Sequence, residues 1–153
     1  MEKDFYLLTL DFNNYLNKTI ITKDEINNLI IMLLDLYSLA LKLPEVNSDN
    51  NIDFYLKVEP EKIKLGEDIT NRYWLLFDPY KKEELVTNTI VDDLEDISKD
   101  LKFGAIEYEK GNINNALFLW KYSHKTHWGE HIANLLKVLN TINYLSERDD
   151  KDE

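Results

Sequence analysis

Residues that form tight turns are scarce in this chain, whose 153 residues include only four glycines and three prolines. An all-β domain needs a turn after each short strand, and glycine and proline supply many of those turns. The scarcity therefore favours long helices. Hydrophobic residues make up 44% of the chain and charged residues 31%, which is the composition of a globular protein that buries a core.

Several long segments carry apolar residues at steps of three and four, which is the spacing of an amphipathic helix. The pattern predicts helices over residues 3–17, 23–43, 87–110, 112–120 and 130–145. Thr22 and Glu25 form a capping-box pair before the second helix, and Thr89 is a weaker cap for the third. Gly111 is placed for the left-handed residue that follows a helix. Gly129 is expected to kink the next helix or to divide it from the last one.

Two segments between the second and third helices lack a helical period. Residues 44–70 are rich in polar residues and contain two of the three prolines, so we expect a long loop there. Residues 73–77 are dense in aromatic and aliphatic side chains and end at Pro79. Their length allows either one helical turn or an extended strand.

The predicted fold is all-α: an irregular bundle of five to six helices with a C-terminal helical hairpin and a long loop at about 44–70. We expect one domain over residues 1–146, followed by a charged disordered tail over 147–153. The side chains of Trp74, Phe77, Trp120 and Trp128 are expected to tie the loop segment to the hairpin.

The chain is acidic, with a formal net charge of −11. This charge argues against nucleic acid as a partner and is compatible with a basic protein partner. The absence of cysteine excludes disulfides, thiolate chemistry and cysteine zinc sites. The start Met1-Glu2-Lys3-Asp4 lacks the features of a signal peptide, and no apolar run approaches a membrane span, so a cytoplasmic location without a membrane partner is expected.

All three histidines lie close together, at His124, His127 and His131. Spacings of three and four place them on one face of an unbroken helix, where His127 and His131 can share a divalent transition metal ion. An aspartate such as Asp92, Asp93 or Asp96 would complete the site. The order His-Trp-Gly-Glu-His differs from the zincin pattern, in which glutamate directly follows the first histidine. The alternative is that these histidines pack in the core or the hairpin.

Aromatic and acidic clusters are further candidates for binding. An aromatic binding surface would be supplied by Trp120, Trp128, Tyr122 and Tyr108, although aromatic residues at helical spacing more often belong to a core. Trp74 is a further candidate for binding. An acidic cluster would bind a cation or a basic partner, or would simply form the solvated face of a helix; it consists of Asp92, Asp93, Glu95 and Asp96. Residues 81–109 hold nine acids and four bases, whereas residues 111–146 hold one acid and three bases, so two antiparallel helices from these segments would attract each other.

Short motifs of well-known enzyme classes are missing from the sequence. It has no Gly-x-Ser-x-Gly, no glycine-rich phosphate loop and no dinucleotide fingerprint. This absence favours a non-catalytic function without excluding an enzyme.

Four successive blocks resemble an uncharacterised bacterial family of all-helical domains of unknown function. The blocks are Tyr73-Trp74-Leu75-Leu76-Phe77-Asp78-Pro79, Asp92-Asp93-Leu94-Glu95-Asp96-Ile97 with Asp100-Leu101-Lys102, Ala116-Leu117-Phe118-Leu119-Trp120, and His127-Trp128-Gly129-Glu130-His131. The resemblance covers roughly residues 24–145, and its last block is the most specific. It implies an all-α bacterial protein and supplies no activity or catalytic residue.

The segment from Gly104 to Trp120 also resembles a single tetratricopeptide-type hairpin. Gly104 and Ala116 stand at the two small-residue positions, and Gly111 falls at the turn. No second copy follows at the repeat spacing of about 34 residues, so the resemblance implies a close helix pair and no repeat array.

Two functions remain open at this point. The first is a non-catalytic protein-interaction module, one version of which is an immunity-type antitoxin whose acidic surface masks a basic partner. The second is a metal- or histidine-dependent enzyme, or a metal-binding protein, that uses His127, His131 and His124.

Overall fold

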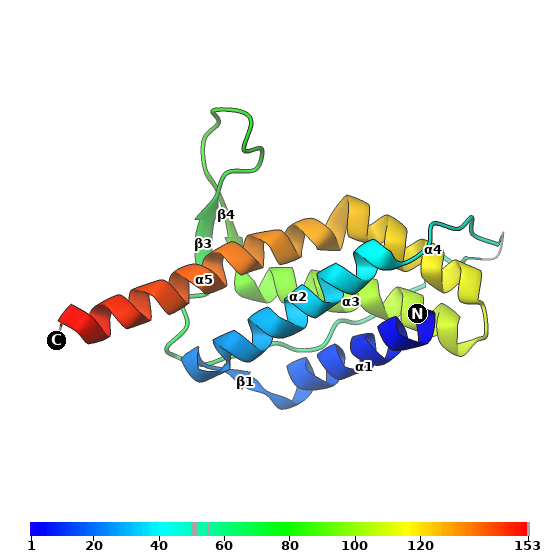
Figure 1. Cartoon of the computed structure of the whole chain (residues 1–153), viewed down its shortest axis with the longest axis horizontal. Helices are drawn as coiled ribbons and strands as arrows, with labels where there is room; N and C mark the ends of the chain where they lie inside the picture. Colours follow the sequence, from blue (N-terminus) through cyan, green and yellow to red (C-terminus); the bar gives the residue numbers. More distant parts are fainter. Residues whose placement is uncertain (50–51, 55, 153) are drawn as a thin grey trace.

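Long helices form the body of the molecule in the computed structural model, which describes residues 1–49, 52–54 and 56–152, the last six of them by their backbone alone. Five α-helices are α1 (Glu2–Lys18), α2 (Ile26–Lys42), α3 (Ile90–Glu109), α4 (Ile113–Ser123) and α5 (Gly129–Asp152). A 3₁₀ turn, η1 (Lys23–Glu25), precedes α2, and a π-helical turn, η2 (His124–Trp128), joins α4 to α5. Because α4, η2 and α5 follow one another without a break, the helices form four rods that lie side by side (Figure 1).

The predicted all-α class is right in outline, because helices contain 64% of the residues. The predicted number of five to six helices differs slightly from the four rods, because two of the five α-helices are joined into one rod. Gly129 does not divide the last two helices, since the π-turn carries the helix through it with helical φ and ψ angles of −61° and −41°.

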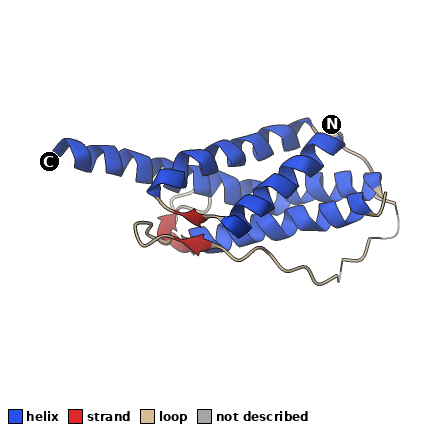
Figure 2. Ribbon diagram, turned by 90° about the horizontal axis from the view of Figure 1, so that it is seen from below, coloured by secondary structure: helices blue, strands red, loops and turns tan. Residues whose placement is uncertain are grey.

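Four short strands, which the all-α prediction missed, pair into two small sheets. β1 (Ile20–Ile21) pairs in parallel with β2 (Lys64–Leu65), and β3 (Arg72–Leu75) pairs antiparallel with β4 (Val86–Thr89). Figure 2 shows the strands gathered beside the helices, and Figure 1 shows the β3–β4 hairpin standing out from the helical body. Residues 73–75 are therefore in a strand, and the segment 73–77 contains no helical turn.

The third helix begins at Ile90, three residues later than predicted, because residues 86–89 form the second strand of the hairpin. Thr89 keeps the extended conformation of a cap, and its hydroxyl accepts a hydrogen bond of 3.1 Å from the backbone N–H of Asp92. The predicted Thr89 cap is confirmed. The cap fixes where α3 begins and hence where its acidic side chains point.

The predicted capping box at Thr22 is wrong. The hydroxyl of Thr22 accepts no cap hydrogen bond in the described structure, and the turn instead closes through its backbone carbonyl, which accepts from the N–H of Glu25 at 2.9 Å. The carboxylate of Glu25 is engaged elsewhere, since it accepts from the hydroxyl of Tyr15 at 2.9 Å. Glu25 thus accepts from Tyr15 on α1 instead of from the backbone N–H of Thr22.

The hydrophobic core lies between the rods and is centred on Trp120 of α4. This side chain is fully buried, its ring meets that of Phe5 at 4.9 Å edge to face, and its indole N–H donates to the carbonyl of Leu101 at 3.0 Å. A Cβ atom on Gly104 would lie 2.1 Å from the indole nitrogen, so α3 needs glycine there. The predicted helical hairpin is confirmed: α3 and α4 pack closely, and Gly111 turns between them with φ of +83°.

The predicted loop at 44–70 is confirmed for its described residues, which contain only the short strand β2 and have a few anchors on the body; residues 50, 51 and 55 lie outside the described structure. Val58 and Ile69 are each 8% exposed and belong to the buried apolar set. The N–H of Glu61 donates to the hydroxyl of Ser98 at 3.0 Å, and the Lys102 ammonium donates to the carbonyl of Glu59 at 2.9 Å. These contacts fasten the connection to α3.

The C-terminal end of the chain is helical as far as Asp152. The predicted disordered tail at 147–153 stays a prediction, because the side chains of 147–152 and all of residue 153 lie outside the described residues. None of the described helices combines the length and the apolar character that a membrane crossing requires.

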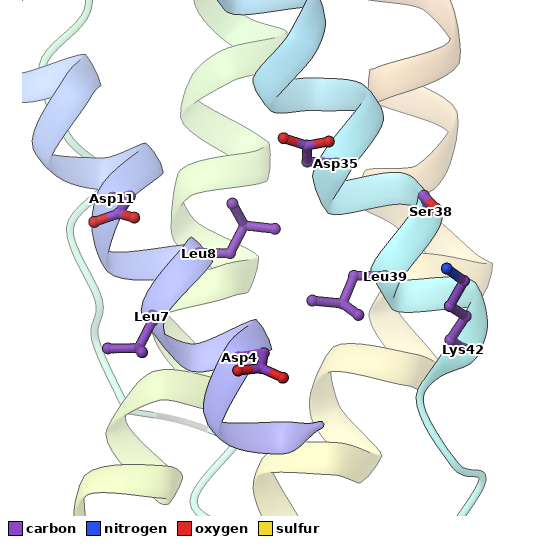
Figure 3. A pocket seen from close by; sticks show the side chains of 8 residues that line it. All are labelled: Asp4, Leu7, Leu8, Asp11, Asp35, Ser38, Leu39 and Lys42. Atoms are coloured by element: carbon purple, nitrogen blue, oxygen red, sulfur yellow. The ribbon is translucent and has the colours of Figure 1, made fainter.

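A groove of about 400 Å³ runs between α1 and α2 (Figure 3). Its apolar lining comes from Leu7, Leu8 and Leu39. The charged residues that line it are, in order, Asp4, Asp11, Asp35 and Lys42. Three carboxylates against one ammonium give this groove a net negative charge.

Candidate metal centre

The π-turn between α4 and α5 sets the direction of all three histidines. The N–H of Gly129 donates to the carbonyl of His124, five residues earlier, which is the hydrogen bond of a π-helix. A Cβ atom at position 129 would lie 2.4 Å from that carbonyl oxygen, so glycine permits the close approach. The wider turn changes the angular relation between His124 and the two later histidines, and such turns recur at functional sites.

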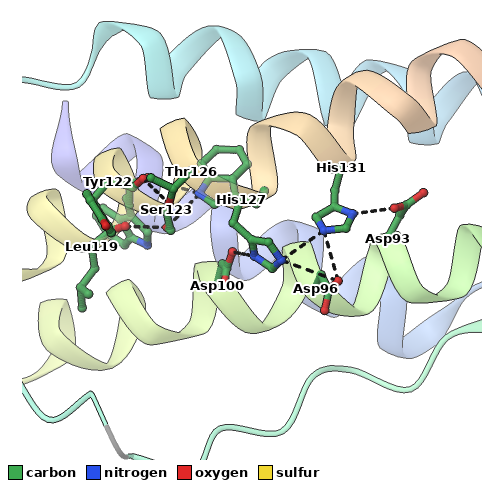
Figure 4. A network of polar contacts seen from close by, with 11 residues as sticks. Asp93, Asp96, Asp100, Leu119, Tyr122, Ser123, Thr126, His127 and His131 are labelled. Carbon is green, nitrogen blue, oxygen red and sulfur yellow. Dashed lines mark hydrogen bonds and ion pairs between the residues drawn. The ribbon is translucent and has the colours of Figure 1, made fainter. Parts of the chain in front are cut away.

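Three aspartates of α3 face the histidines across the seam between α3 and α5. Asp93, Asp96 and Asp100 follow one another at steps of three and four, so they lie along one face of α3. Figure 4 shows these carboxylates and the rings of His127 and His131 pointing toward one another. Two imidazoles of the later rod, not its lysines, contact these carboxylates of the acidic helix.

Each of the two seam histidines is held by a carboxylate on its Nδ1 atom. His127 Nδ1 lies 2.6 Å from Asp100, and His131 Nδ1 lies 2.6 Å from Asp93. With Nδ1 as the donor in these bonds, the Nε2 atoms carry the free lone pairs and point into the space between the helices.

The two Nε2 atoms converge with a third potential ligand, the carboxylate of Asp96. They lie 3.2 Å apart, and Asp96 Oδ2 lies 3.2 Å from His131 Nε2 and 3.8 Å from His127 Nε2 (Figure 4). Two ligands bonded to zinc at about 2.0–2.1 Å in tetrahedral geometry are about 3.3 Å apart. His127, His131 and Asp96 therefore stand at the separations of three ligands on one metal ion.

The hairpin β3–β4 holds Asp93 in place. This carboxylate is fully buried, and it accepts hydrogen bonds from the hydroxyl of Tyr73 on β3 and from the amide of Asn88 on β4, the latter at 2.6 Å. Burial and the hydrogen bond to Asp93 raise the pKa of the Tyr73 hydroxyl, so it remains a proton donor. Strand alternation directs Tyr73 toward the helices and Trp74 away from them.

The electrostatics of the seam favour a cation. Burial lowers the pKa of His131, but the hydrogen bond and the negative charge of Asp93 outweigh it with help from Asp96, so the net shift is upward. Burial raises the pKa of Asp100 even though its His127 partner opposes the rise. Three carboxylates against two imidazoles leave an excess of negative charge that a proton or a metal ion can offset.

His124, the third predicted ligand, does not join this cluster. It is 6% exposed, and its ring meets those of Tyr37 and Trp128 edge to face, each at 4.6 Å. Its Nε2 atom has no hydrogen-bond partner among the described residues. Burial, then the charges of Lys121 and Lys125, lower its pKa. The buried ring of His124 thus lies apart from the ligand atoms of His127 and His131, with which the sequence pattern grouped it.

The remaining candidate residues separate into exposed and buried groups. Trp74 is 66% exposed on β3 and Phe77 is 64% exposed, so neither side chain is buried between the loop segment and the helical hairpin as expected. Trp120 and Trp128 are fully buried and offer no binding surface, because both indoles pack in the core. Asp92 is exposed in the first turn of α3 and forms no part of the seam.

Comparison with known proteins gives a family and a fold. A family model described as "Domain of unknown function (DUF5063)" matches residues 18–145. The chain belongs to this family. Its fold is similar to that in the crystal structure of protein BF1032 from Bacteroides fragilis, with a TM-score of 0.67, 19% identity and coverage of 93% of this chain and 94% of that one. No curated protein matches the chain.

The part of the chain that matches the DUF5063 family contains every residue of the seam. It spans the hairpin, α3, the π-turn and most of α5, which together supply the aspartates and both histidines. The sequence block His127-Trp128-Gly129-Glu130-His131 that carried the resemblance is therefore also the block that presents Nε2 atoms to Asp96.

Two residues of the seam were missed at the level of sequence. Asp100 was counted among the acids of α3 without a role, although it lies four residues after Asp96 and holds His127. Glu130 was noted only for its departure from the zincin order. His-x-x-Glu-His is the inverted order found in another group of zinc enzymes, and that signal was available in the sequence.

A cavity of about 330 Å³ opens beside the two histidines, between α5 and the hairpin. It is lined by Leu75, Phe77, Val86, Thr87, Asn88, His127, Glu130, His131 and Asn134. A second cavity, of about 270 Å³, lies on the other side of His127 between α3, α4 and the connection at 52–54. His127 thus lines both cavities.

Proposed function

We propose that this chain binds one divalent transition metal ion through Nε2 of His127, Nε2 of His131 and the carboxylate of Asp96. One observation supports the proposal above others: both Nδ1 atoms are fixed by buried or half-buried aspartates, and the two Nε2 atoms meet 3.2 Å apart. Carboxylate–histidine–metal arrangements orient the ring and raise its basicity in the same way. Two free lone pairs at this distance repel each other unless a proton or a metal ion lies between them.

The ligand set favours zinc. Two imidazoles and one carboxylate are the protein ligands of one class of catalytic zinc site and also of non-haem iron sites. Ligands at right angles in an octahedral iron site lie about 3.0 Å apart, and tetrahedral ligands about 3.3 Å. The three separations here, 3.2, 3.2 and 3.8 Å, are closer to the tetrahedral value.

An open coordination position is a further part of the proposal. Structural zinc sites are closed by four protein ligands, whereas three protein ligands leave a position for water or substrate. The side chains of His127 and Asp96 are 47% and 42% exposed, so solvent reaches the metal position. This exposure supports a reactive or sensing site over a purely structural one.

The test is calorimetric titration of the full chain, freed of metal with a chelator, against Zn²⁺ and then against Fe²⁺ without oxygen. We expect one equivalent of Zn²⁺ to bind and the melting temperature to rise, because a ligand bound only by the folded state stabilises it. The double variant His127→Ala/His131→Ala should lose both effects, and the control His124→Ala should keep the stoichiometry. Equal binding by wild type and double variant, or no binding of either metal, would overturn the proposal.

A second candidate function rests on the groove between α1 and α2. Its apolar floor of leucines lies between Asp4, Asp11 and Asp35 (Figure 3), which together favour an amphipathic helix of a partner whose apolar stripe is flanked by lysine and arginine. An immunity-type antitoxin that masks a basic protein would use such a groove.

A designed peptide tests the groove directly. The probe is a fluorescent 18-residue helix with leucine at helical spacing and lysine on both flanks, and a scrambled peptide of equal charge is the control. Anisotropy should show binding to wild type that weakens with salt and weakens further in Asp11→Asn/Asp35→Asn. Equal binding of both peptides would mean that charge alone attracts them and would exclude a specific groove.

A further inference from the structure

Glu130 lies beside the proposed metal ligands in the sequence but is not one of them. It is the only acid between residues 111 and 146, and it lies three residues after His127 and directly before His131. His127 lies in η2, and Glu130 and His131 lie in the first turn of α5. Steps of three and four from His127 bring each of these two residues near the face of the rod that carries His127. All three line the cavity of about 330 Å³ beneath the hairpin.

The other acids of the seam have partners that account for them. Asp93 and Asp100 hold the Nδ1 atoms, and Asp96 approaches both Nε2 atoms. Glu130 is exposed to solvent at the mouth of the cavity. A carboxylate in this place can accept a proton from water held at the open metal position.

We infer that Glu130 is the general base of a metal-dependent hydrolysis of an uncharged amide bond in a peptide, a reaction that rests on the proposed metal site. Glu130 takes a proton from water as the water oxygen bonds to the carbonyl carbon. The carbon–nitrogen bond then breaks, and the proton passes from Glu130 to the leaving amine. One water is consumed, and a carboxylic acid and an amine are formed.

The charge of the cavity selects the class of substrate. Glu130 lines the cavity, Asp93, Asp96 and Asp100 contact the two histidines that line it, and no lysine or arginine is among its described lining residues. A phosphate ester would be repelled by these carboxylates, whereas an uncharged amide or a cationic peptide would not. The substrate class is therefore peptide rather than phosphoester.

The apolar wall of the cavity determines which substrate side chain binds next to the scissile bond. Leu75, Phe77 and Val86 of the hairpin face the metal ligands across the cavity. Phe77 is 64% exposed, so its ring is available to a ligand. A peptide whose scissile bond is flanked by a large apolar side chain would bury that side chain against the hairpin while its carbonyl reaches the metal position.

The experiment uses the full chain loaded with Zn²⁺ and a pool of internally quenched peptides that varies both residues around a central bond. Wild type should cleave peptides with a large apolar residue beside the bond. Glu130→Gln should bind Zn²⁺ with unchanged stoichiometry and cleave at least about 100-fold more slowly, as expected for loss of a general base. Glu84→Gln, an exposed carboxylate outside the cavity, is the matched control and should cleave like wild type.

The outcomes separate this inference from the metal site on which it rests. If Zn²⁺ binds and no peptide in the pool is cleaved, or if Glu130→Gln cleaves as fast as wild type, the hydrolysis is refuted while the metal site stands. If no metal binds, the proposed function fails first. Phe77→Ala should raise KM for the apolar peptides and leave Zn²⁺ binding unchanged, and an unchanged KM would refute the role of the hairpin wall.

Discussion

The rod made of α4, the π-turn and α5 has two sides that use similar residues for opposite purposes. On the core side, His124 meets Tyr37 and Trp128, and burial lowers its pKa. On the α3 side, His127 and His131 meet carboxylates, and the pKa of His131 is raised despite burial. The residues that pack against a histidine therefore decide its environment. Spacing along the chain does not, because all three histidines follow one another at steps of three and four.

The largest expected effect is a loss of unfolding free energy from a substitution on the core side. Trp120→Ala removes a fully buried indole and its hydrogen bond to Leu101, and it should cost about 3–5 kcal/mol of unfolding free energy. Trp74→Ala, an exposed indole on the hairpin, is the control and should change stability by no more than about 0.5 kcal/mol. Urea denaturation measures both. Equal losses in the two variants would contradict this assignment of the core.

The π-turn links the two sides, and Gly129→Ala should damage both. The added Cβ would lie 2.4 Å from the carbonyl oxygen of His124, so the turn must shift, at a cost of about 1–3 kcal/mol. The same shift should weaken metal binding, because the turn positions His127. Asn140→Ala, an exposed position further along α5, is the control for both measurements. If the Gly129→Ala variant is destabilised but keeps its full metal affinity, the π-turn does not link the stability of the core side to metal binding on the α3 side.

Substitution of Asp100, whose carboxylate contacts His127, should affect only the seam between α3 and α5. Asp100→Asn leaves the ring contact possible but removes its charge, and we expect about 10- to 100-fold weaker Zn²⁺ binding, measured by competition with a chromophoric chelator. Asp92→Asn removes an exposed charge about two turns before Asp100 on α3 and should leave the affinity within about threefold. Similar losses in both variants would mean that net charge, and not the Asp100–His127 contact, controls the affinity.

The smallest expected effect is a pH dependence on the core side. Because burial holds the folded-state pKa of His124 below its ordinary value of about 6.5, the unfolded state binds more protons there. The contribution of neutral His124 to stability is therefore present above that value and is lost as pH falls below it. His124→Phe should lose less stability than wild type between about pH 7 and pH 5, in metal-free urea titrations. Parallel pH profiles would contradict the lowered pKa.

Much of the fold could be predicted from the sequence because its helices are strongly periodic. The hairpin of α3 and α4 followed from Gly111 and the small residue Gly104, and both act as expected. The β3–β4 hairpin could not be predicted with the same certainty, because its strands are four residues each and carry no helical period. The capping box at Thr22 does not form, because the carboxylate of Glu25 accepts a hydrogen bond from Tyr15 on α1, a residue outside the local capping pattern.

The candidate site was predictable in its histidine pair and not in its geometry. The i, i+4 spacing of His127 and His131 indicated a shared ligand, but a π-turn has no distinct sequence signature beyond Gly129, so the separate direction of His124 was missed. The choice among Asp92, Asp93, Asp96 and Asp100 depends on the rotation of α3 relative to α5. That rotation follows from long-range packing around Trp120, which spacing within one helix does not encode.

The most direct test of the comparison is a long-range proton–nitrogen correlation spectrum of the three imidazoles, recorded before and after one equivalent of Zn²⁺. We expect the Nε2 signals of His127 and His131 to move to the metal-bound position while their Nδ1 atoms keep protons, and the His124 signals to stay near those of a neutral ring. A shift at His124, or unchanged Nε2 signals at His127 and His131, would contradict the metal centre.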